Sequence, residues 1–423
     1  MAGLMSGNIL LTLLSSMLFA RALGPEGFGD FTFVLAVVAF LALPTKAGLP
    51  DLLVREVAKY QLSQSWGLIK GILKLANGFV LLYTLIVIVG ALAFVGWYWS
   101  GEESSRADAL LWALCLLPLI AFEGVRSGTL RGFRWVVSSA VSEQLVKPLV
   151  LVLCLGGAVL IGAKISPITA VHINILAGLA ALVVGVFFLY RAVPVEVRDS
   201  GTEYATRSWA GSLAPLALFT GLQMLDSQIS ILLLGAIATS EDVALFRIAV
   251  TGAGLVVFGL MAVNMALAPQ VSRLYNSGEF EQLQKVINLS TRLVAVISFP
   301  VALVFILWGE ALIAIIFGDE YRKAGLALSV LCIGQIVNSA AGSVGLVLNM
   351  TGHDRKTLPA VLAAVIANIV ISIVLIPGYG CVGAAIGYSA SLVIWNLILV
   401  VVTKKTLGIN TFVLNVSISW LRR

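Results

Sequence analysis

Charged side chains are scarce in this chain of 423 residues. Asp, Glu, Lys and Arg make up 11% of it, whereas 60% of its side chains are hydrophobic and the mean hydropathy is +1.03. A soluble domain needs charge on roughly a quarter of its residues to cover its surface. The deficit therefore predicts a polytopic membrane protein, in which lipid covers the apolar surface.

Histidine and cysteine are also rare, which argues against several site chemistries. His172 and His353 are the two histidines, and neither has a metal-ligand partner three or four residues away, so we expect neither a zinc site nor a Ser-His catalytic site. The four cysteines show no disulfide framework or metal spacing. The sequence contains no G-x-x-x-x-G-K-[ST] loop for nucleotide phosphates. We expect no metal and no cofactor.

About twelve apolar runs have the length that a membrane-crossing helix needs, about 20 residues. They predict an all-α polytopic membrane protein with about twelve transmembrane helices in two six-helix bundles around a central cavity. The expected spans are 4–23, 28–49, 72–98, 109–122, 145–161, 168–190, 213–238, 243–267, 293–307, 326–348, 358–376 and 382–402.

Lysine and arginine gather in alternate loops, and this asymmetry predicts the orientation. Because inner loops retain basic residues, both termini are expected on the cytoplasmic side. The net charge of +6 is dispersed over short loops, so nucleic acid is not an expected partner. The first run begins almost at Met1 and is not a signal peptide, and the sequence leaves open whether the natural start lies upstream.

The two halves of the chain resemble each other. Residues 26–31 follow the first span as a polar turn, and residues 241–246 follow the seventh span in the same way. Six spans separate the two turns, so both halves would have the same orientation. This repeat predicts a six-helix lobe over residues 1–200 and a second over residues 201–423, which is a transporter architecture.

Ionisable residues inside the predicted spans are the candidate functional residues, because each raises the free energy of insertion by at least about 2.5 kcal/mol. Asp226 and Arg247 lie well inside apolar runs on neighbouring helices, and each is favoured for a cavity-facing role, as a pair or separately. Lys46 could equally extend to the interface, and Arg55 with Glu56 could equally be the end of a helix.

Two further groups complete the set. Glu123 lies inside a span, and Arg21 lies near the end of one. Arg126 and Arg131, in contrast, are expected to be ordinary anchors at the inner face. A cavity lined by arginine and lysine suits an anionic substrate, because guanidinium groups bind phosphate oxygens bidentately. Glutamines and asparagines of the second half either bind sugar hydroxyls or hold helices together.

The stretch from Ala20 to Phe31 (ARALGPEGFGDF), followed by Gly48-Leu49 and Val54-Arg55-Glu56, closely resembles the opening of Wzx-type polysaccharide flippases. The second half carries further similar motifs in the expected order. These are ALFR at 244–247, APQ at 268–270, RLY at 273–275, FGDEY at 317–321 and GLVLNMTGH at 345–353. The resemblance covers nearly the whole chain and implies the multidrug/oligosaccharidyl-lipid/polysaccharide exporter superfamily.

The resemblance implies translocation of an undecaprenyl-pyrophosphate-linked glycan across a bacterial inner membrane. Arg247 and Arg55 are then the expected contacts to pyrophosphate or anionic sugar, with Lys46 and Arg21 as weaker candidates. Asp226 and Glu123 are expected to couple an ion or balance charge. The expected partners are the lipid bilayer, the lipid-linked glycan and, functionally, polysaccharide polymerase and chain-length machinery.

Three alternatives stay open. A multidrug antiporter of the same superfamily would carry a carboxylate in the first helix, and residues 4–23 contain none. A peptidoglycan-precursor flippase would share the mechanism but usually has two more spans. A glycan polymerase or ligase would need a sizeable outer loop for its acceptor, whereas the longest predicted loops, about 51–71 and 192–208, lie on the inner side.

Overall fold

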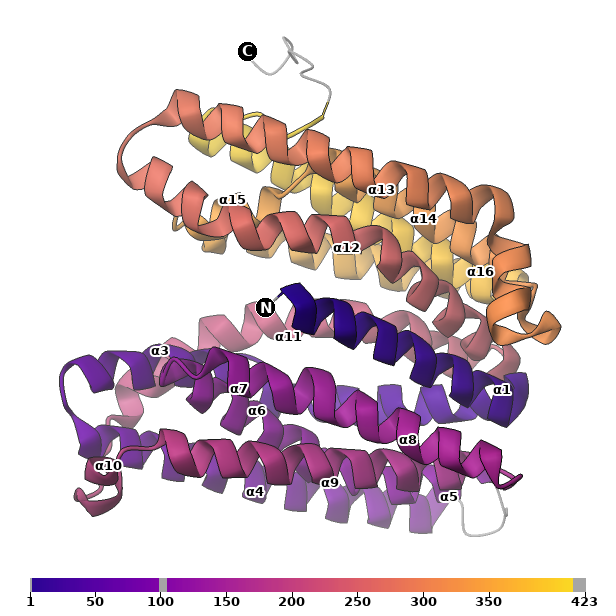
Figure 1. Cartoon of the computed structure of the whole chain (residues 1–423), viewed down its shortest axis with the longest axis horizontal. Helices are drawn as coiled ribbons and strands as arrows, with labels where there is room; N and C mark the ends of the chain where they lie inside the picture. Colours follow the sequence, from indigo (N-terminus) through magenta and orange to yellow (C-terminus); the bar gives the residue numbers. More distant parts are fainter. Residues whose placement is uncertain (1, 99–104, 414–423) are drawn as a thin grey trace. The chain divides into compact units, whose positions relative to one another are not determined.

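The computed structural model describes residues 2–98 and 105–413, and every regular element in that part of the chain is helical (Figure 1). The chain divides into two compact units, Met1–Gln228 and Ile229–Arg423. The first unit holds α1 (Ala2–Leu41), α2 (Leu43–Lys46), α3 (Leu49–Leu62), α4 (Trp66–Tyr98), α5 (Ser105–Ala113), α6 (Leu116–Gly132), α7 (Val136–Val141), the π-helix η1 (Ser142–Val146), α8 (Lys147–Leu160), α9 (Pro167–Ala192), α10 (Val195–Asp199) and most of α11 (Thr206–Ile237). The second holds α12 (Ser240–Asn276), α13 (Phe280–Phe317), η2 (Asp319–Tyr321), α14 (Ala324–Ala341), α15 (Val344–Met350), η3 (Asp354–Thr357) and α16 (Leu358–Leu407).

Helix α1 reverses direction at Gly24. This residue has φ 68° and ψ 175°, a conformation that glycine adopts without steric strain, and Pro25 follows it. The rings of Phe19 and Phe31 stack with their centroids 4.6 Å apart. In a straight helix these residues would lie about 18 Å apart. Helix α1 is therefore two segments, as the sequence predicts from its two apolar runs.

Helix α16 reverses in the same way at Gly380, which has φ 51°. A Cβ atom at Gly387 would lie 3.2 Å from the carbonyl oxygen of Asn368, although the two would be about 28 Å apart in a straight helix. Asp242 fixes the reversal, because its Oδ1 accepts a hydrogen bond from the backbone N–H of Cys381 at 2.9 Å. This carboxylate satisfies an N–H group at the start of the second segment of α16.

The described residues contain ten helices that are long and apolar enough to cross a membrane. When α1 and α16 are each counted as two segments, the ten become twelve, a number compatible with the prediction. Several predicted boundaries are wrong, and the ninth span, expected at 293–307, extends over Phe280–Phe317. The fifth span was expected from residue 145, but the candidate span begins at Val136. The expected inner loop at 51–71 is largely helical, since α3 occupies most of it.

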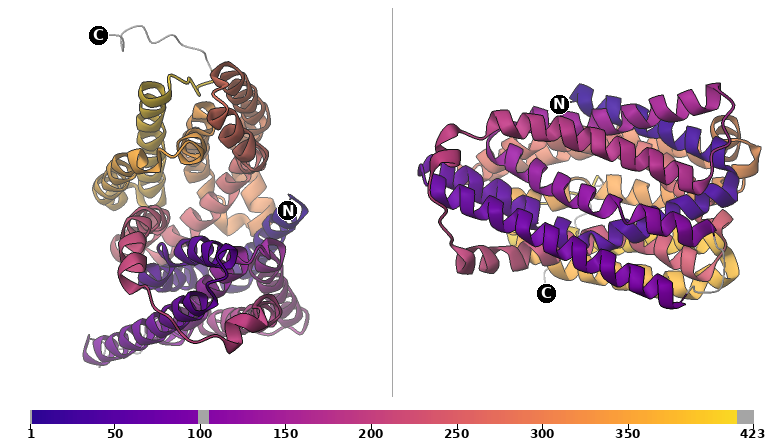
Figure 2. Two further views of the ribbon diagram at one scale, coloured as in Figure 1. Left: turned by 90° about the vertical axis from the view of Figure 1, so that its left-hand side faces the viewer. Right: turned by 90° about the horizontal axis from the view of Figure 1, so that it is seen from below.

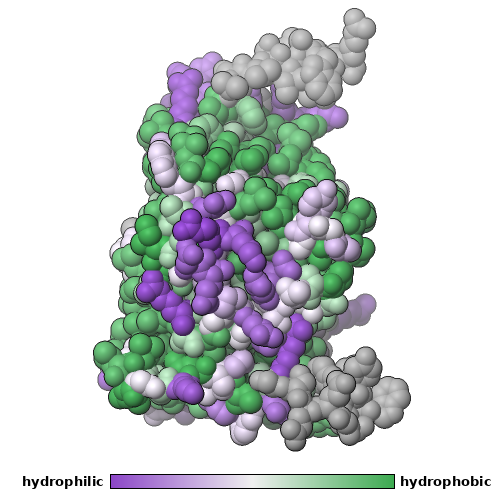
Figure 3. Space-filling view, turned by 90° about the vertical axis from the view of Figure 1, so that its right-hand side faces the viewer, coloured by the Kyte–Doolittle hydropathy of each residue, from purple (hydrophilic) through white to green (hydrophobic). Residues whose placement is uncertain are grey.

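Packing in the first unit centres on α6 and α9. Helix α6 packs against α3 and α9, and α8 packs against α1 and α9. Figure 2 shows the helices of this unit, in indigo to magenta, from two further sides. The outer side of α4 carries a row of leucine, isoleucine and valine side chains that are each more than half exposed: Leu81, Leu82, Leu85, Ile86 and Val89. Such a row is expected to face lipid. Figure 3 looks along the helices, and in that view hydrophilic residues gather in the middle beside hydrophobic ones.

The segment between α9 and α11 lies directly on the start of α4. Lys70 Nζ donates hydrogen bonds to the carbonyl oxygens of Arg198 and Ser200 at 2.6 and 2.7 Å. The N–H of Glu203 donates to the carbonyl of Gly67 at 3.0 Å. Close approach is possible because Gly67 and Gly71 have no Cβ atom. This segment was expected to be a loop, and it is in fact held tightly to the first unit.

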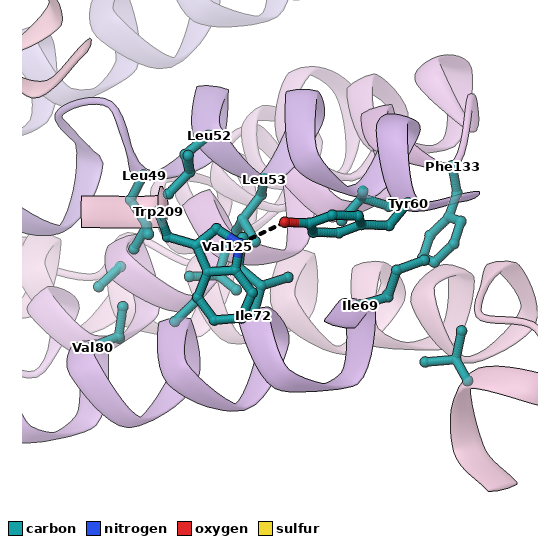
Figure 4. Close-up of a cluster of buried hydrophobic side chains, with 14 residues drawn as sticks. Leu49, Leu52, Leu53, Tyr60, Ile69, Ile72, Val80, Val125, Phe133 and Trp209 are labelled. Carbon is teal, nitrogen blue, oxygen red and sulfur yellow. Dashed lines mark hydrogen bonds between the residues drawn. The ribbon is translucent and has the colours of Figure 1, made fainter. Parts of the chain in front are cut away.

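A cluster of buried hydrophobic side chains next to this segment anchors the start of α11 (Figure 4). Trp209 is 2% exposed, and its Nε1–H donates a hydrogen bond to the Tyr60 hydroxyl at 2.9 Å. Leucine, isoleucine and valine side chains from α3, α4 and α6 surround the pair. Burial raises the pKa of the Tyr60 hydroxyl, so it stays neutral. The beginning of α11 is thus a fixed part of the first unit.

Candidate functional site

Two oppositely charged side chains are buried one helical turn apart on α6. Glu123 is 7% exposed and Arg126 is 2% exposed, and both belong to a candidate membrane span. Residues three apart lie on the same helix face. Arg126 Nη2 lies 3.7 Å from Glu123 Oε1, an ion-pair distance that exceeds that of a hydrogen bond. The two groups are therefore close enough for an ion pair but too far apart for a hydrogen bond.

Residues of two neighbouring helices, η1 and α9, enclose the Arg126 guanidinium. Its Nη1 donates a hydrogen bond to Ser142 Oγ on the π-helical turn η1. Gly185 of α9 leaves the space that the guanidinium occupies, and a Cβ atom there would overlap it. In the described part of the chain, Nε and Nη2 of Arg126 and Oε1 of Glu123 are buried without a hydrogen-bond partner. Unsatisfied buried groups of this kind are uncommon and often mark a functional site.

Three further charged groups surround Glu123. Lys147 on α8, Glu143 on η1 and Lys46 on α2 all lie close enough to act on its charge. Glu143 is exposed, whereas Lys46 and Lys147 are half-buried. With Arg126, the group contains three cations and two carboxylates, so its formal charge is +1 when Glu123 is ionised. We call these five residues the α6 charge cluster.

The cluster brings together two of the predicted site residues, Lys46 and Glu123. The interpretation of Arg126 as an inner-face anchor is wrong, because the side chain is buried among helices. Glu143 and Lys147 lie at the start of the fifth span and were not among the predicted site residues. Their spacing of four residues next to an apolar run is a signal that the sequence does contain.

Arg55 on α3 is engaged by a neighbouring carboxylate. Its Nε and Nη2 donate to Glu56 Oε1 at 3.1 and 2.9 Å, and Lys59 Nζ lies 3.8 Å from Glu56 Oε2. The Glu56 side chain is 4% exposed, whereas that of Arg55 is 51% exposed. The alternative interpretation of Arg55 and Glu56 as the end of a helix is wrong, because both lie in the middle of α3. The Arg55 side chain remains accessible.

Arg21 and Asp226 are not among the charged groups that act on Glu123, and Arg247 belongs to the second unit. Arg21 is exposed on α1, and Asp226 is half-buried on α11 in the first unit. Arg247 is half-buried on α12 in the second unit, where Phe246 and Ile248 beside it are buried. Within the described residues, no ion pair to the Arg247 side chain is found. The predicted pairing of Asp226 with Arg247 stays a prediction.

The amides of the second unit mostly bind one another. Asn396 Nδ2 donates to Asn338 Oδ1 at 3.0 Å, and Asn338 Nδ2 donates to Gln335 Oε1 at 3.0 Å. Ser230 and Ser372 both donate to Asn368 Oδ1 at 3.1 Å. These bonds join α14 to α16 and α11 to α16, so these amides hold helices together. The described residues contain no cluster of three or more His, Cys, Asp or Glu side chains suited to a metal.

Comparison with solved structures defines the fold of this protein. Its fold resembles that of a multidrug resistance MATE family transporter of the MOP superfamily in an inward-facing conformation, with a TM-score of 0.79 and 15% identity over 95% of this chain and 94% of that one. It also resembles the lipid II flippase MurJ in an inward closed conformation, with a TM-score of 0.73 and 11% identity over 94% and 86% of the two chains. The protein thus has the all-α, two-bundle fold of multi-pass membrane transporters.

Sequence similarity identifies the family. Residues 3–275 match the family described as "Polysaccharide biosynthesis protein", and the chain belongs to it. Residues 215–376 also match the family described as MatE. The relatives include a putative O-antigen transporter of Shigella flexneri, 23% identical over 90% of both chains, and the probable flippase AglR of Haloferax volcanii, 23% identical over 89% of this chain and 76% of that protein. The match to the probable low-salt glycan biosynthesis flippase Agl15 of Haloferax volcanii, at 24% identity, covers 39% of this chain and 35% of that protein.

Proposed function

We propose that this protein is a flippase for a lipid-linked oligosaccharide, an undecaprenyl-pyrophosphate-linked repeat unit of a surface polysaccharide. It moves the head group from the cytoplasmic to the outer leaflet of a bacterial inner membrane. The observation that carries the proposal is the similarity to a putative O-antigen transporter over 90% of both chains, together with the family match over residues 3–275. The wholly helical fold with ten long apolar helices in the described residues supports it.

In this proposal, the protein works with two lobes of six helices each, and both termini are cytoplasmic. The glycan and pyrophosphate enter a central cavity while the polyprenyl tail stays in lipid, and the head group leaves on the other side as the lobes alternate. No bond is made or broken in this cycle, so the protein is a transporter and not an enzyme. Functional association with a polysaccharide polymerase and chain-length machinery is expected, because these consume the product.

The residues proposed to bind the anionic head group are Arg247 and Arg55, with weaker contributions from Lys46 and Arg21. Arg247 is supported by its half-buried position in an apolar helix, where a cation without a partner is unfavourable unless a ligand compensates it. Arg55 is supported by its accessible side chain. Asp226 and Glu123 are proposed to couple an ion or to balance charge.

The alternative transport functions are less well supported. The MatE match over residues 215–376 favours a cation-coupled multidrug antiporter, but residues 4–23 offer no carboxylate for cation coupling. A peptidoglycan-precursor flippase would share the cationic site, since its substrate also carries pyrophosphate. A glycan polymerase or ligase is the alternative of a different class, and it would act after translocation.

Deletion of the gene tests the proposal through the sidedness of the lipid-linked oligosaccharide. In oriented membrane vesicles from cells without the protein, we expect the oligosaccharide to accumulate on the cytoplasmic face, shielded from a non-permeant glycosidase or lectin, and surface polysaccharide to be lost. Oligosaccharide that reaches the outer face but stays unpolymerised or unattached would overturn the flippase proposal and favour an enzyme.

Replacing Arg247 with glutamine should reduce the rate of surface polysaccharide export about 10- to 100-fold with unchanged protein abundance. The variant loses charge-assisted hydrogen bonds of about 1.5–3 kcal/mol to the substrate. Arg322→Gln is a matched control, because Arg322 also lies in the second unit but is exposed and pairs with Asp319. Export at the normal rate in Arg247→Gln would disprove the role of Arg247. Asp226→Asn then separates two roles: in the Arg247→Gln background it should lower export further if Asp226 couples an ion, and should add nothing to the defect if Asp226 merely balances the Arg247 charge.

A further inference from the structure

The chain folds back on the second unit after its last helix. Helix α16 ends at Leu407, and Gly408 follows in the left-handed conformation with φ 70°. A Cβ atom at Gly408 would meet nothing within 4 Å, so the chain is free to turn there. Residues 409–413 then run outside any helix along α13 and the end of α14. We call residues 408–413 the C-terminal strap.

The Gln284 side chain of α13 pairs with the backbone of the strap at two points. Its Nε2 donates a hydrogen bond to the carbonyl oxygen of Asn410 at 2.6 Å, and its Oε1 accepts one from the N–H of the same residue at 2.8 Å. A carboxamide carries the same donor and acceptor as a peptide group, so Gln284 takes the place of a neighbouring β-strand. Asn288 Oδ1 accepts a second hydrogen bond from Nε2 at 2.7 Å and fixes the orientation of the amide.

Further contacts of the strap reach three other parts of the second unit. Thr291 Oγ1 on α13 donates to the carbonyl oxygen of Thr411 at 3.1 Å. The N–H of Val413 donates to the carbonyl oxygen of Ala340, at the end of α14, at 2.9 Å. Ile409 is 3% exposed and packs in a hydrophobic cluster with residues of α12, α13 and α15. The docked strap therefore joins four helices at one end of this unit.

The contacts of Thr411 are incompletely satisfied in the docked state. Its Oγ1 is buried without a hydrogen-bond partner in the part of the chain that the structure describes. The single hydroxyl proton of Thr291 is shared, because the carbonyl oxygen of Ile287 also lies 3.0 Å from Oγ1. Burial of an unpaired hydroxyl is unfavourable, whereas water would satisfy it once the strap leaves. Release of the strap thus relieves a cost that docking imposes.

We propose that the C-terminal strap is an autoinhibitory segment that leaves α13 and α14 during transport. While it is docked, the ends of α12, α13, α14 and α15 are tied together and cannot move relative to one another. When the chain turns at Gly408, the strap leaves, the hydrophobic cluster loses Ile409, and these helix ends become free. The proposed function enters only because the rate of export is one of the two readouts.

Hydrogen exchange of the purified full-length protein in lipid nanodiscs measures release of the strap. The Val413 amide is the decisive probe, since Gln284→Met leaves its acceptor, Ala340, unchanged. The variant removes both hydrogen bonds between Gln284 and Asn410, so exchange at Val413 should become at least about fivefold faster. Gln282→Met is the matched control, because Gln282 is exposed on the same helix, and it should exchange as the wild type does.

Thr411→Val tests the opposite direction. Valine has nearly the shape of threonine but no hydroxyl, so the docked strap loses its unsatisfied group, while the Thr411 carbonyl oxygen still accepts from Thr291. Exchange at Val413 should become at least about fivefold slower. A general loosening of the fold cannot give opposite changes in the two variants, and Thr411→Val serves if Gln284→Met does not fold.

Export distinguishes an autoinhibitory strap from one that only stabilises the fold. At equal protein abundance, the initial rate of surface polysaccharide export should rise at least about twofold in Gln284→Met and fall by a similar factor in Thr411→Val, with Gln282→Met unchanged. A merely stabilising strap predicts slower export in Gln284→Met. That result, unchanged export in both variants, or unchanged Val413 exchange would overturn the proposal. The exchange measurements do not depend on the sidedness assay, so failure of the strap and failure of the flippase function can be told apart.

Discussion

Replacing Gly71 with alanine should strongly destabilise the protein and reduce its abundance in the membrane. A Cβ atom at this position of α4 would overlap the carbonyl oxygen of Glu203 and lie 2.9 Å from its carbonyl carbon. The obstacle is backbone, which cannot rotate away as a side chain can. The two Lys70 hydrogen bonds hold the neighbouring Arg198 and Ser200 against α4, so the segment cannot simply retreat. Overpacking of this kind costs about 1–3 kcal/mol, and loss of the segment's hydrogen bonds adds to it.

The measurement is thermal unfolding of the purified protein in detergent, together with its abundance in membranes. Gly78→Ala is the matched control, because Gly78 lies on the same helix and a Cβ atom there would meet nothing within 4 Å. Gly78→Ala should be neutral or slightly stabilising, since alanine favours a helix more than glycine does. If the two alanine variants unfold at the same temperature, the segment between α9 and α11 does not lie on α4 as described.

Replacing Gly185 with alanine should abolish transport and destabilise the first unit. The new methyl group would occupy the position of the Arg126 guanidinium and force it away from Ser142. The variant would combine overpacking, about 1–3 kcal/mol, with the loss of a hydrogen bond to a charged group, about 1.5–3 kcal/mol. Export of surface polysaccharide and thermal unfolding should both be measured. A displaced guanidinium would also change the electrostatic environment of the Glu123 carboxyl group.

Gly178→Ala provides the comparison on the same helix. Its Cβ atom would meet only the side chain of Leu119, at 3.3 Å, and that side chain can adjust. We expect nearly normal export and stability for Gly178→Ala. If Gly185→Ala is equally benign, α9 does not enclose the Arg126 side chain as described.

The helices were predictable from the sequence because lipid imposes a simple rule, an apolar run of about 20 residues for each crossing. The rule identified both segments of α1 and of α16, and it placed a turn near Gly24 and near Gly380. It did not locate the start of the fifth span, because Glu143 and the polar residues before it interrupt the apolar pattern there. A π-helical turn with half-buried and exposed charges has no such pattern in sequence.

The candidate site was predictable only in part. Glu123 and Lys46 could be selected because charges are rare in apolar runs, and the structure places them near each other. Arg126 was assigned to the interface because its distance from the span end allowed that. Its burial depends on the absence of a side chain at Gly185, about sixty residues away on another helix, which no local pattern reveals. The roles of Arg247, Arg55, Arg21 and Asp226 stay predictions.

The central claim is tested most directly by reconstitution. The purified protein would be placed in liposomes that contain a fluorescent undecaprenyl-pyrophosphate-linked oligosaccharide in both leaflets, and an impermeant quencher or glycosidase would report the exposed fraction over time. The proposal predicts that the wild type makes the inner pool accessible, and that Arg247→Gln does so at least about tenfold more slowly. If the inner pool stays inaccessible with correctly folded wild-type protein, the protein does not flip this class of lipid by itself, and the proposed function is wrong.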